Sequence, residues 1–102
     1  MFFKNQQLDN RFAQWMNELN ERGGYGALYG KKTPFVHTVG KRYIKIIECL
    51  GNGTQKSVFA FVDADGNIYK PDGWAKPSKY IRAHLTNEKL PMVFGELYAG
   101  RL

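Results

Sequence analysis

The residues best suited to chemistry lie in one short stretch, residues 70–82. It combines four basic residues with a tryptophan: Lys70, Trp74, Lys76, Lys79 and Arg82. Lysine and arginine pair with phosphates, and an exposed tryptophan can stack on an unpaired base. Pro77 and Ser78 are typical of a helix start, whose first N–H groups would add an anion site. The stretch predicts contact with nucleic acid, although a tryptophan that closes the core beside solvated lysines is an open alternative.

A glycine-rich segment at residues 23–32 supplies secondary candidates. Glycines would allow a nucleic-acid backbone to approach, tyrosines would stack, and Lys31 and Lys32 would neutralise phosphates. The segment matches neither the P-loop nor the dinucleotide fingerprint, because no strand precedes it and its glycine spacing differs. A connection whose tyrosines pack on the rest of the fold is the alternative interpretation.

Metal binding and catalysis have little support in the sequence. Residues 63–67 resemble the start of a calcium loop, but the third acidic ligand and the distal glutamate are missing, so a hairpin turn is expected. His37 and His84 have no cysteine or spaced carboxylates near them, and Glu48 and Asp72 form no evident acid–base pair. We therefore expect no enzyme activity, no metal and no cofactor.

The elements that must position these residues give an α+β fold in a single domain, 1–102. Apolar residues at helical spacing predict a helix over 9–22, capped by Asp9, and residues 23–41 are expected to be a loop. Alternating apolar residues and turn signals predict a three-stranded antiparallel meander over 42–70, with strands 42–50, 55–63 and 67–70. A second helix is expected over 78–85, followed by an apolar tail, 91–102, whose state is open. The predicted order is α-β-β-β-α.

Composition and charge bound the class of protein. The chain of 102 residues carries 15 Lys+Arg against 9 Asp+Glu, a net charge of +6, and residues 41–85 hold eight basic and four acidic groups. Such a domain attracts polyanions. No run approaches the length of a membrane span and no secretory signal is evident. The lone Cys49, expected to be a buried thiol, fits a reducing compartment, so we expect a cytoplasmic protein with no membrane partner.

Residues 57–79 resemble small uncharacterised proteins encoded by tailed phages. The resemblance rests on the run 57–63 followed by Gly66, 68–70, Trp74, Pro77 and Lys79. It implies a phage origin, and action in the host cytoplasm, but no particular activity. The order of elements is also similar to that of the double-stranded RNA-binding domain, in which a basic cluster begins the second helix; Lys76, Lys79 and Arg82 take that place.

The sheet followed by a helix further resembles DNA-binding domains of the integrase N-terminal type, whose sheet enters the major groove. Lys45, Lys56 and Lys70 could serve such a face. We therefore expect a small non-catalytic protein that binds DNA or RNA. The rival interpretations are a phage-encoded protein that binds or inhibits a host protein through its aromatic residues, and a virion or assembly component. The oligomeric state is left open.

Overall fold

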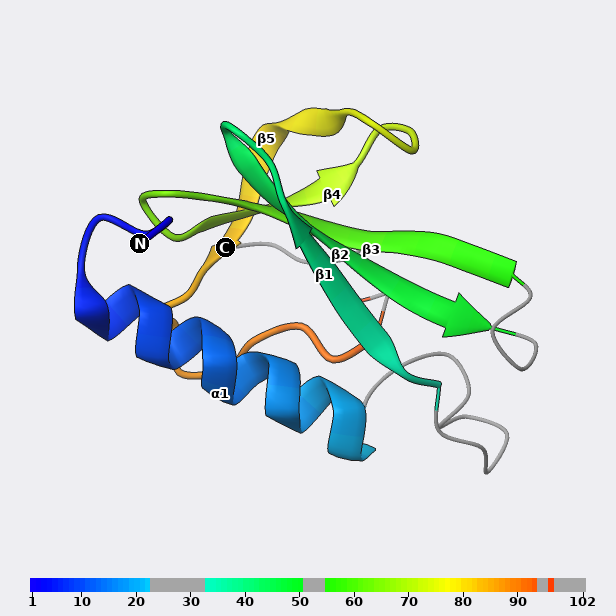
Figure 1. Ribbon diagram of the computed structural model, residues 1–102, viewed down its shortest axis with the longest axis horizontal. Coiled ribbons are helices and arrows are strands. Elements are labelled where there is room, and N and C mark those ends of the chain that lie inside the picture. Colours follow the sequence, from blue (N-terminus) through cyan, green and yellow to red (C-terminus); the bar gives the residue numbers. More distant parts are fainter. Residues whose placement is uncertain (23–32, 51–54, 94–95, 97–102) are drawn as a thin grey trace.

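In the computed structural model, an N-terminal helix lies against an antiparallel sheet (Figure 1). It describes residues 1–22, 33–50, 55–93 and 96. Within these residues the sheet has five strands in sequence order, each paired with the next. The elements are α1 (Gln6–Arg22), β1 (Phe35–Val39), β2 (Tyr43–Leu50), β3 (Gln55–Asp63), β4 (Asn67–Pro71) and β5 (Pro77–His84).

Helix α1 begins one turn before the predicted start. The side-chain Oδ1 of Asn5 accepts a hydrogen bond from the Leu8 N–H at 2.9 Å, so Asn5 rather than Asp9 caps the helix. The predicted apolar stripe is confirmed. All five of its members are buried against the sheet: Leu8, Phe12, Trp15, Met16 and Leu19.

Strands β2, β3 and β4 confirm the predicted meander within a residue or two at each end. The simple alternation expected along β3 fails at a bulge, because Ile46 pairs with Ala60 whereas Ile47 pairs with Val58. Phe59 is the extra residue, and it packs in the core together with Ala60. The turn predicted at 51–53 lies outside the described residues.

The helix predicted over 78–85 is wrong. Residues 77–84 form β5, which pairs with β4 through Ile68–Ala83 and Tyr69–Ile81. Without this partner β4 would expose a row of unpaired N–H and C=O groups, and Pro77 is tolerated because it is the first residue of the strand. The loop predicted over 23–41 is wrong in its second part, because Phe35–Val39 forms β1 on β2; residues 23–32 lie outside the described part.

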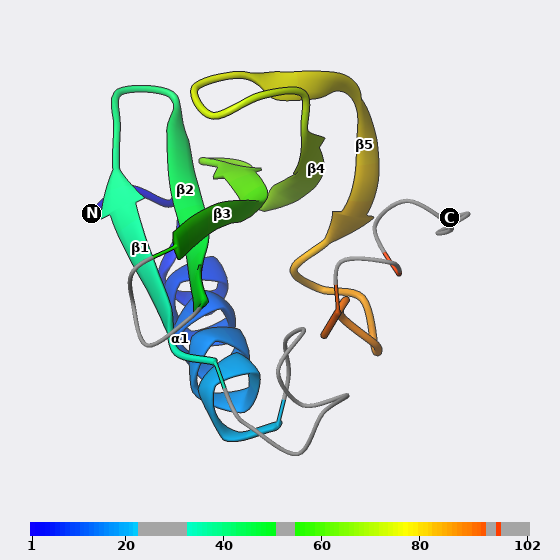
Figure 2. The same cartoon turned by 90° about the vertical axis from the view of Figure 1, so that its right-hand side faces the viewer.

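Helix α1 covers one face of the sheet, and the core lies between them. Figure 2 shows the helix below β1 and β2, with β5 at the opposite edge of the sheet. Trp15 is fully buried and donates from Nε1 to the Pro91 carbonyl oxygen at 2.9 Å, which ties the segment after β5 to the helix. Cys49 is half-buried rather than buried. No described helix is long and apolar enough to cross a membrane.

Candidate functional site

The sheet has a second face, turned away from α1, which we call the outer face. On β2, Ile44 and Ile46 lie in the core, so the intervening Lys45 points to the outer face. Residues directly opposite one another in an antiparallel sheet share a face. The strand register therefore places one row on the outer face across all five described strands: Thr38, Lys45, Phe61, Tyr69 and Ile81.

Three aromatic rings from three strands pack together on this face. The Tyr43 ring meets Phe61 and Tyr69 edge to face, with centroids 6.0 Å and 5.7 Å apart. Phe61 is only 3% exposed although it lies outside the main core. Edge-to-face pairs of this kind stabilise by about 0.5–1.5 kcal/mol beyond the area they bury. The outer face of β2–β4 is therefore a packed surface that can support a site.

Asp63 organises the turn between β3 and β4, which confirms the predicted hairpin. Its Oδ1 accepts from the backbone N–H groups of Asp65 and Asn67, and its Oδ2 accepts from Asn67 Nδ2 and from the Tyr69 hydroxyl at 2.8 Å. Burial, then this hydrogen bond to a carboxylate, raises the pKa of Tyr69 to about 12. Tyr69 is therefore fixed in its protonated form beside the turn.

Trp74 lies in the connection between β4 and β5. A hydrogen bond from the Asp72 N–H to the Lys76 carbonyl oxygen, 2.8 Å long, closes this connection. The Trp74 side chain is an exposed aromatic, 53% accessible, and the Lys45 Nζ lies 4.5 Å from its ring centroid. An ammonium group at this distance is attracted to the ring by its quadrupole. The contact holds the indole over the outer face of the sheet.

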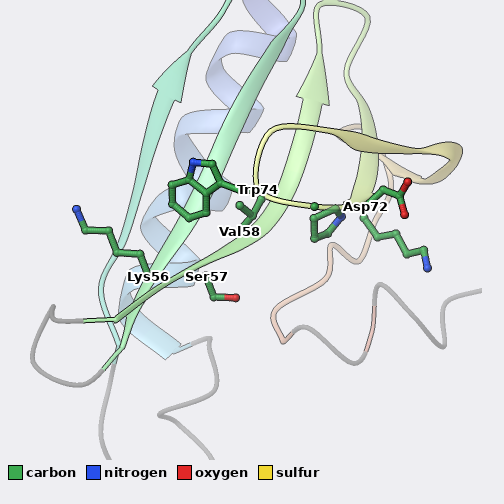
Figure 3. A pocket seen from close by; sticks show the side chains of 8 residues that line it. Lys56, Ser57, Val58, Asp72 and Trp74 are labelled. Carbon is green, nitrogen blue, oxygen red and sulfur yellow. The ribbon is translucent and has the colours of Figure 1, made fainter.

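A groove of about 470 Å³ lies beside this indole (Figure 3). One side comes from β3 and the other from the end of β4 and its following loop. Its lining residues are Lys56, Ser57, Val58, Lys70, Pro71, Asp72, Gly73 and Trp74. In Figure 3, Lys56 and Asp72 lie at opposite ends, and Trp74, Val58 and Ser57 lie between them. The groove joins apolar surface to lysines from two strands.

Comparison with known proteins gives one match. A family model described as a family of unknown function (DUF7717) matches residues 5–98. The chain belongs to this DUF7717 family. No curated protein and no solved structure matches the chain. The region shared with the family includes α1, all five described strands and every residue that lines the groove.

The structure brings together, at the groove, two of the residues that the sequence predicted to bind nucleic acid. Lys70 and Trp74 both line the groove. Lys76 is exposed in the same loop, Lys79 is exposed on β5 and Arg82 is half-buried there, and none of these three lines it. Because residues 77–84 form a strand, the helix N-terminus expected to bind an anion does not exist. Lys31 and Lys32 lie outside the described residues.

Lys45, Lys56 and Ser57 belong to the groove region but lie outside the cluster predicted at residues 70–82. Lys45 and Lys56 were named only for an integrase-like sheet face, and Ser57 carried no signal. These residues meet Trp74 because the loop between β4 and β5 folds back across β3 towards β2. A search for basic residues on strands facing away from the apolar stripe could have found Lys45, since it alternates with Ile44 and Ile46.

The other candidate residues are engaged elsewhere. His84 Nε2 lies 2.7 Å from the Asp65 carbonyl oxygen, and the His37 ring packs on Phe12. Glu48 is buried and accepts a hydrogen bond from the Thr33 hydroxyl on the side of the sheet away from the groove. Among the described residues no group of three or more His, Cys, Asp or Glu side chains could hold a metal ion.

Proposed function

We propose that this chain is a small non-catalytic protein that binds nucleic acid in the groove beside Trp74. The observation that supports the proposal most is the position of the indole. It is exposed and held by Lys45, and it forms part of a groove that also contains Lys56 and Lys70. An aromatic ring next to lysines is the combination with which proteins hold bases and phosphates at the same time.

The charge around the groove supports the same proposal. Lys45, Lys56 and Lys70 come from three adjacent strands, and Asp72 is the acidic residue among the groove lining. Exposed Lys76 and Lys79 follow in the loop and on β5, so the basic surface continues beyond the groove. With a net charge of +6, the protein would attract a polyanion before any specific contact forms.

The resemblance of residues 57–79 to phage proteins extends the proposal to the origin of the protein and to the compartment in which it acts. The motif includes Lys70 and Trp74, two residues of the groove. A phage-encoded protein of this kind would act on nucleic acid in the host cytoplasm. If the protein failed to bind nucleic acid in the experiment below, a host protein would become the favoured ligand.

The test is fluorescence anisotropy with labelled single-stranded DNA, duplex DNA and duplex RNA. Phosphate contacts predict that affinity falls steeply with salt; three lysine contacts to a single strand give a slope of about −2 in log–log form, so affinity should fall about 15-fold between roughly 50 and 200 mM salt. Lys56→Met should weaken binding and flatten this slope. Lys89→Met removes the same charge from an exposed site beside α1 and serves as control.

Absence of binding to all three probes at low salt would contradict the proposal. So would equal losses in Lys56→Met and Lys89→Met, because the groove would then have no part in the interaction beyond its contribution to net charge.

A further inference from the structure

We propose that the polymer held in the groove is single-stranded and that one unpaired base stacks on the Trp74 ring. This inference rests on the proposed function and names the class of ligand. It follows from the way the indole is presented, from the shape of the groove and from the position of the lysines.

The Trp74 ring offers its flat surface on one side only. The Lys45 ammonium lies over the ring at 4.5 Å from the centroid, yet Lys45 is not among the residues that line the groove, whereas Trp74 is. The cation and the groove therefore meet different parts of the indole. In Figure 3 the flat of the ring faces the viewer, and the Trp74 side chain is 53% exposed. An open ring face beside a groove is a stacking surface.

Stacking on such a surface requires a base with an uncovered face. In a duplex each base is covered by its neighbours above and below, so only its edges can be reached from the grooves. An unpaired base has a free face, and stacking on an aromatic side chain strengthens binding by about 1–3 kcal/mol per base, which corresponds to about 5- to 150-fold in affinity. The indole thus favours a single strand over a duplex.

The shape of the groove agrees with this preference. Its volume, about 470 Å³, is in the range of about 300–1,000 Å³ that small-molecule sites occupy. The apolar surfaces of Val58 and Pro71 suit the ring of a base. A duplex is usually read by a helix or ribbon inserted into its major groove. Here the described helix lies behind the sheet, on the side away from the groove.

The lysines stand where the backbone of such a strand would pass. Lys56 comes from β3 and Lys70 from β4, so the two charges approach the groove from neighbouring strands. A strand with one base against Trp74 has a phosphate on each side of that base, and two separated lysines can neutralise both. Asp72, the acidic residue of the lining, lies at the end opposite Lys56 in Figure 3.

The deciding experiment compares three labelled DNA probes of equal length, about eight nucleotides. One is oligothymidylate, one is an abasic strand that keeps the phosphates and lacks the bases, and one is a duplex. We expect the wild-type protein to bind oligothymidylate about 10-fold more tightly than the abasic strand, and more tightly than the duplex. Oligothymidylate should also quench part of the tryptophan fluorescence, and that quenching should vanish in Trp74→Phe.

Three variants separate stacking from loss of structure. The Trp74→Leu variant should bind oligothymidylate no more tightly than it binds the abasic strand. Its affinity for the abasic strand should equal that of the wild type, because the phosphate contacts are intact. Trp74→Phe keeps an aromatic ring and should retain most of the difference. Tyr80→Leu removes another exposed aromatic, 69% accessible on β5 and outside the groove lining, and should leave all affinities unchanged.

Equal wild-type affinities for oligothymidylate and the abasic strand would overturn the stacking inference while leaving phosphate binding in place. Tighter binding to the duplex would also overturn it. A failure to bind any of the three probes would overturn the proposed function itself, and with it this inference.

Discussion

Lys45 of β2 and the indole of Trp74 form a contact that spans the sheet, with the Nζ 4.5 Å from the ring centroid. Strand β2 pairs with β1 and β3, whereas Trp74 follows β4, so the contact reaches across β3. It anchors the connection between β4 and β5 to the outer face and sets one wall of the groove. The stability of this loop and the shape of the site should therefore depend on the same pair.

Replacing Lys45 by methionine tests this contact. The substitution removes the ammonium group and keeps an unbranched apolar chain, so the loss should be mainly that of the cation–π attraction, about 0.5–1 kcal/mol in the free energy of unfolding. Urea denaturation measures it. Acrylamide quenching of tryptophan emission should increase as the indole is released. Lys89→Met, a matched charge change on the α1 side, should stay within about 0.5 kcal/mol of wild type and leave the quenching unaltered.

Gly66 is the position in the turn between β3 and β4 where a side chain has no room. Its φ is +89°, and a Cβ there would lie 2.9 Å from Leu8 Cδ2 and 3.1 Å from His84 Nε2. Leu8 is buried in the core and cannot move away freely. Gly66→Ala should therefore lower the free energy of unfolding by about 2 kcal/mol or more, since strain and contact add.

Gly73→Ala is the control for that substitution. Gly73 also has a positive φ, +155°, but a Cβ there would meet no atom within 4 Å. It should show the backbone strain alone, and so a smaller loss than Gly66→Ala in the same urea experiment. An equal loss at both positions would show that contact with Leu8 and His84 contributes nothing.

Asp63 accepts four hydrogen bonds at the same turn, two from backbone N–H groups and two from side chains. Asp63→Ala leaves these donors without their acceptor and should cost about 2 kcal/mol or more of the free energy of unfolding. Asp65→Ala is the matched control. The Asp65 carboxylate makes an exposed ion pair with Lys4 at 3.6 Å, which contributes about 0–1 kcal/mol. Thermal unfolding followed by circular dichroism should rank the two variants in this order.

Tyr69 should make stability depend on pH in the alkaline range. Its pKa is raised from 10.0 to about 12 in the folded protein, so the folded state holds the proton more tightly than the unfolded state does. The resulting stabilisation is complete below pH 10 and is lost as the pH rises through 12. Urea denaturation across this range should show the fall, and Tyr69→Phe should show less of it.

The control for this prediction is Tyr80→Phe on the exposed side of β5, which should keep the wild-type pH profile. At neutral pH, Tyr69→Phe should also lose about 1 kcal/mol, because Asp63 loses the hydroxyl donor. A tyrosinate absorbance titration without a tyrosine that ionises above pH 10 would contradict the raised pKa of Tyr69.

The sequence by itself determined the elements whose signals are local. The apolar stripe of α1 repeats at helical spacing, and β2, β3 and β4 are bounded by turn residues, so their ends follow from a few neighbouring positions. The buried members of the stripe and the turn at Asp63 were predicted for the same reason. Lys70 and Trp74, which both line the groove, were predicted together because they lie close together along the chain.

Only the tertiary structure decided β1, β5 and the groove. Residues 77–84 begin with a proline and a serine, a pattern that suits a helix, but pairing with β4 satisfies backbone groups that a helix there would leave exposed at the sheet edge. Lys45 and Trp74 meet because the β4–β5 loop folds over the outer face, and nothing in either local sequence encodes that return. Strand pairing and cross-sheet contacts join residues that are distant in the chain, so the spacing of neighbouring residues does not predict these contacts.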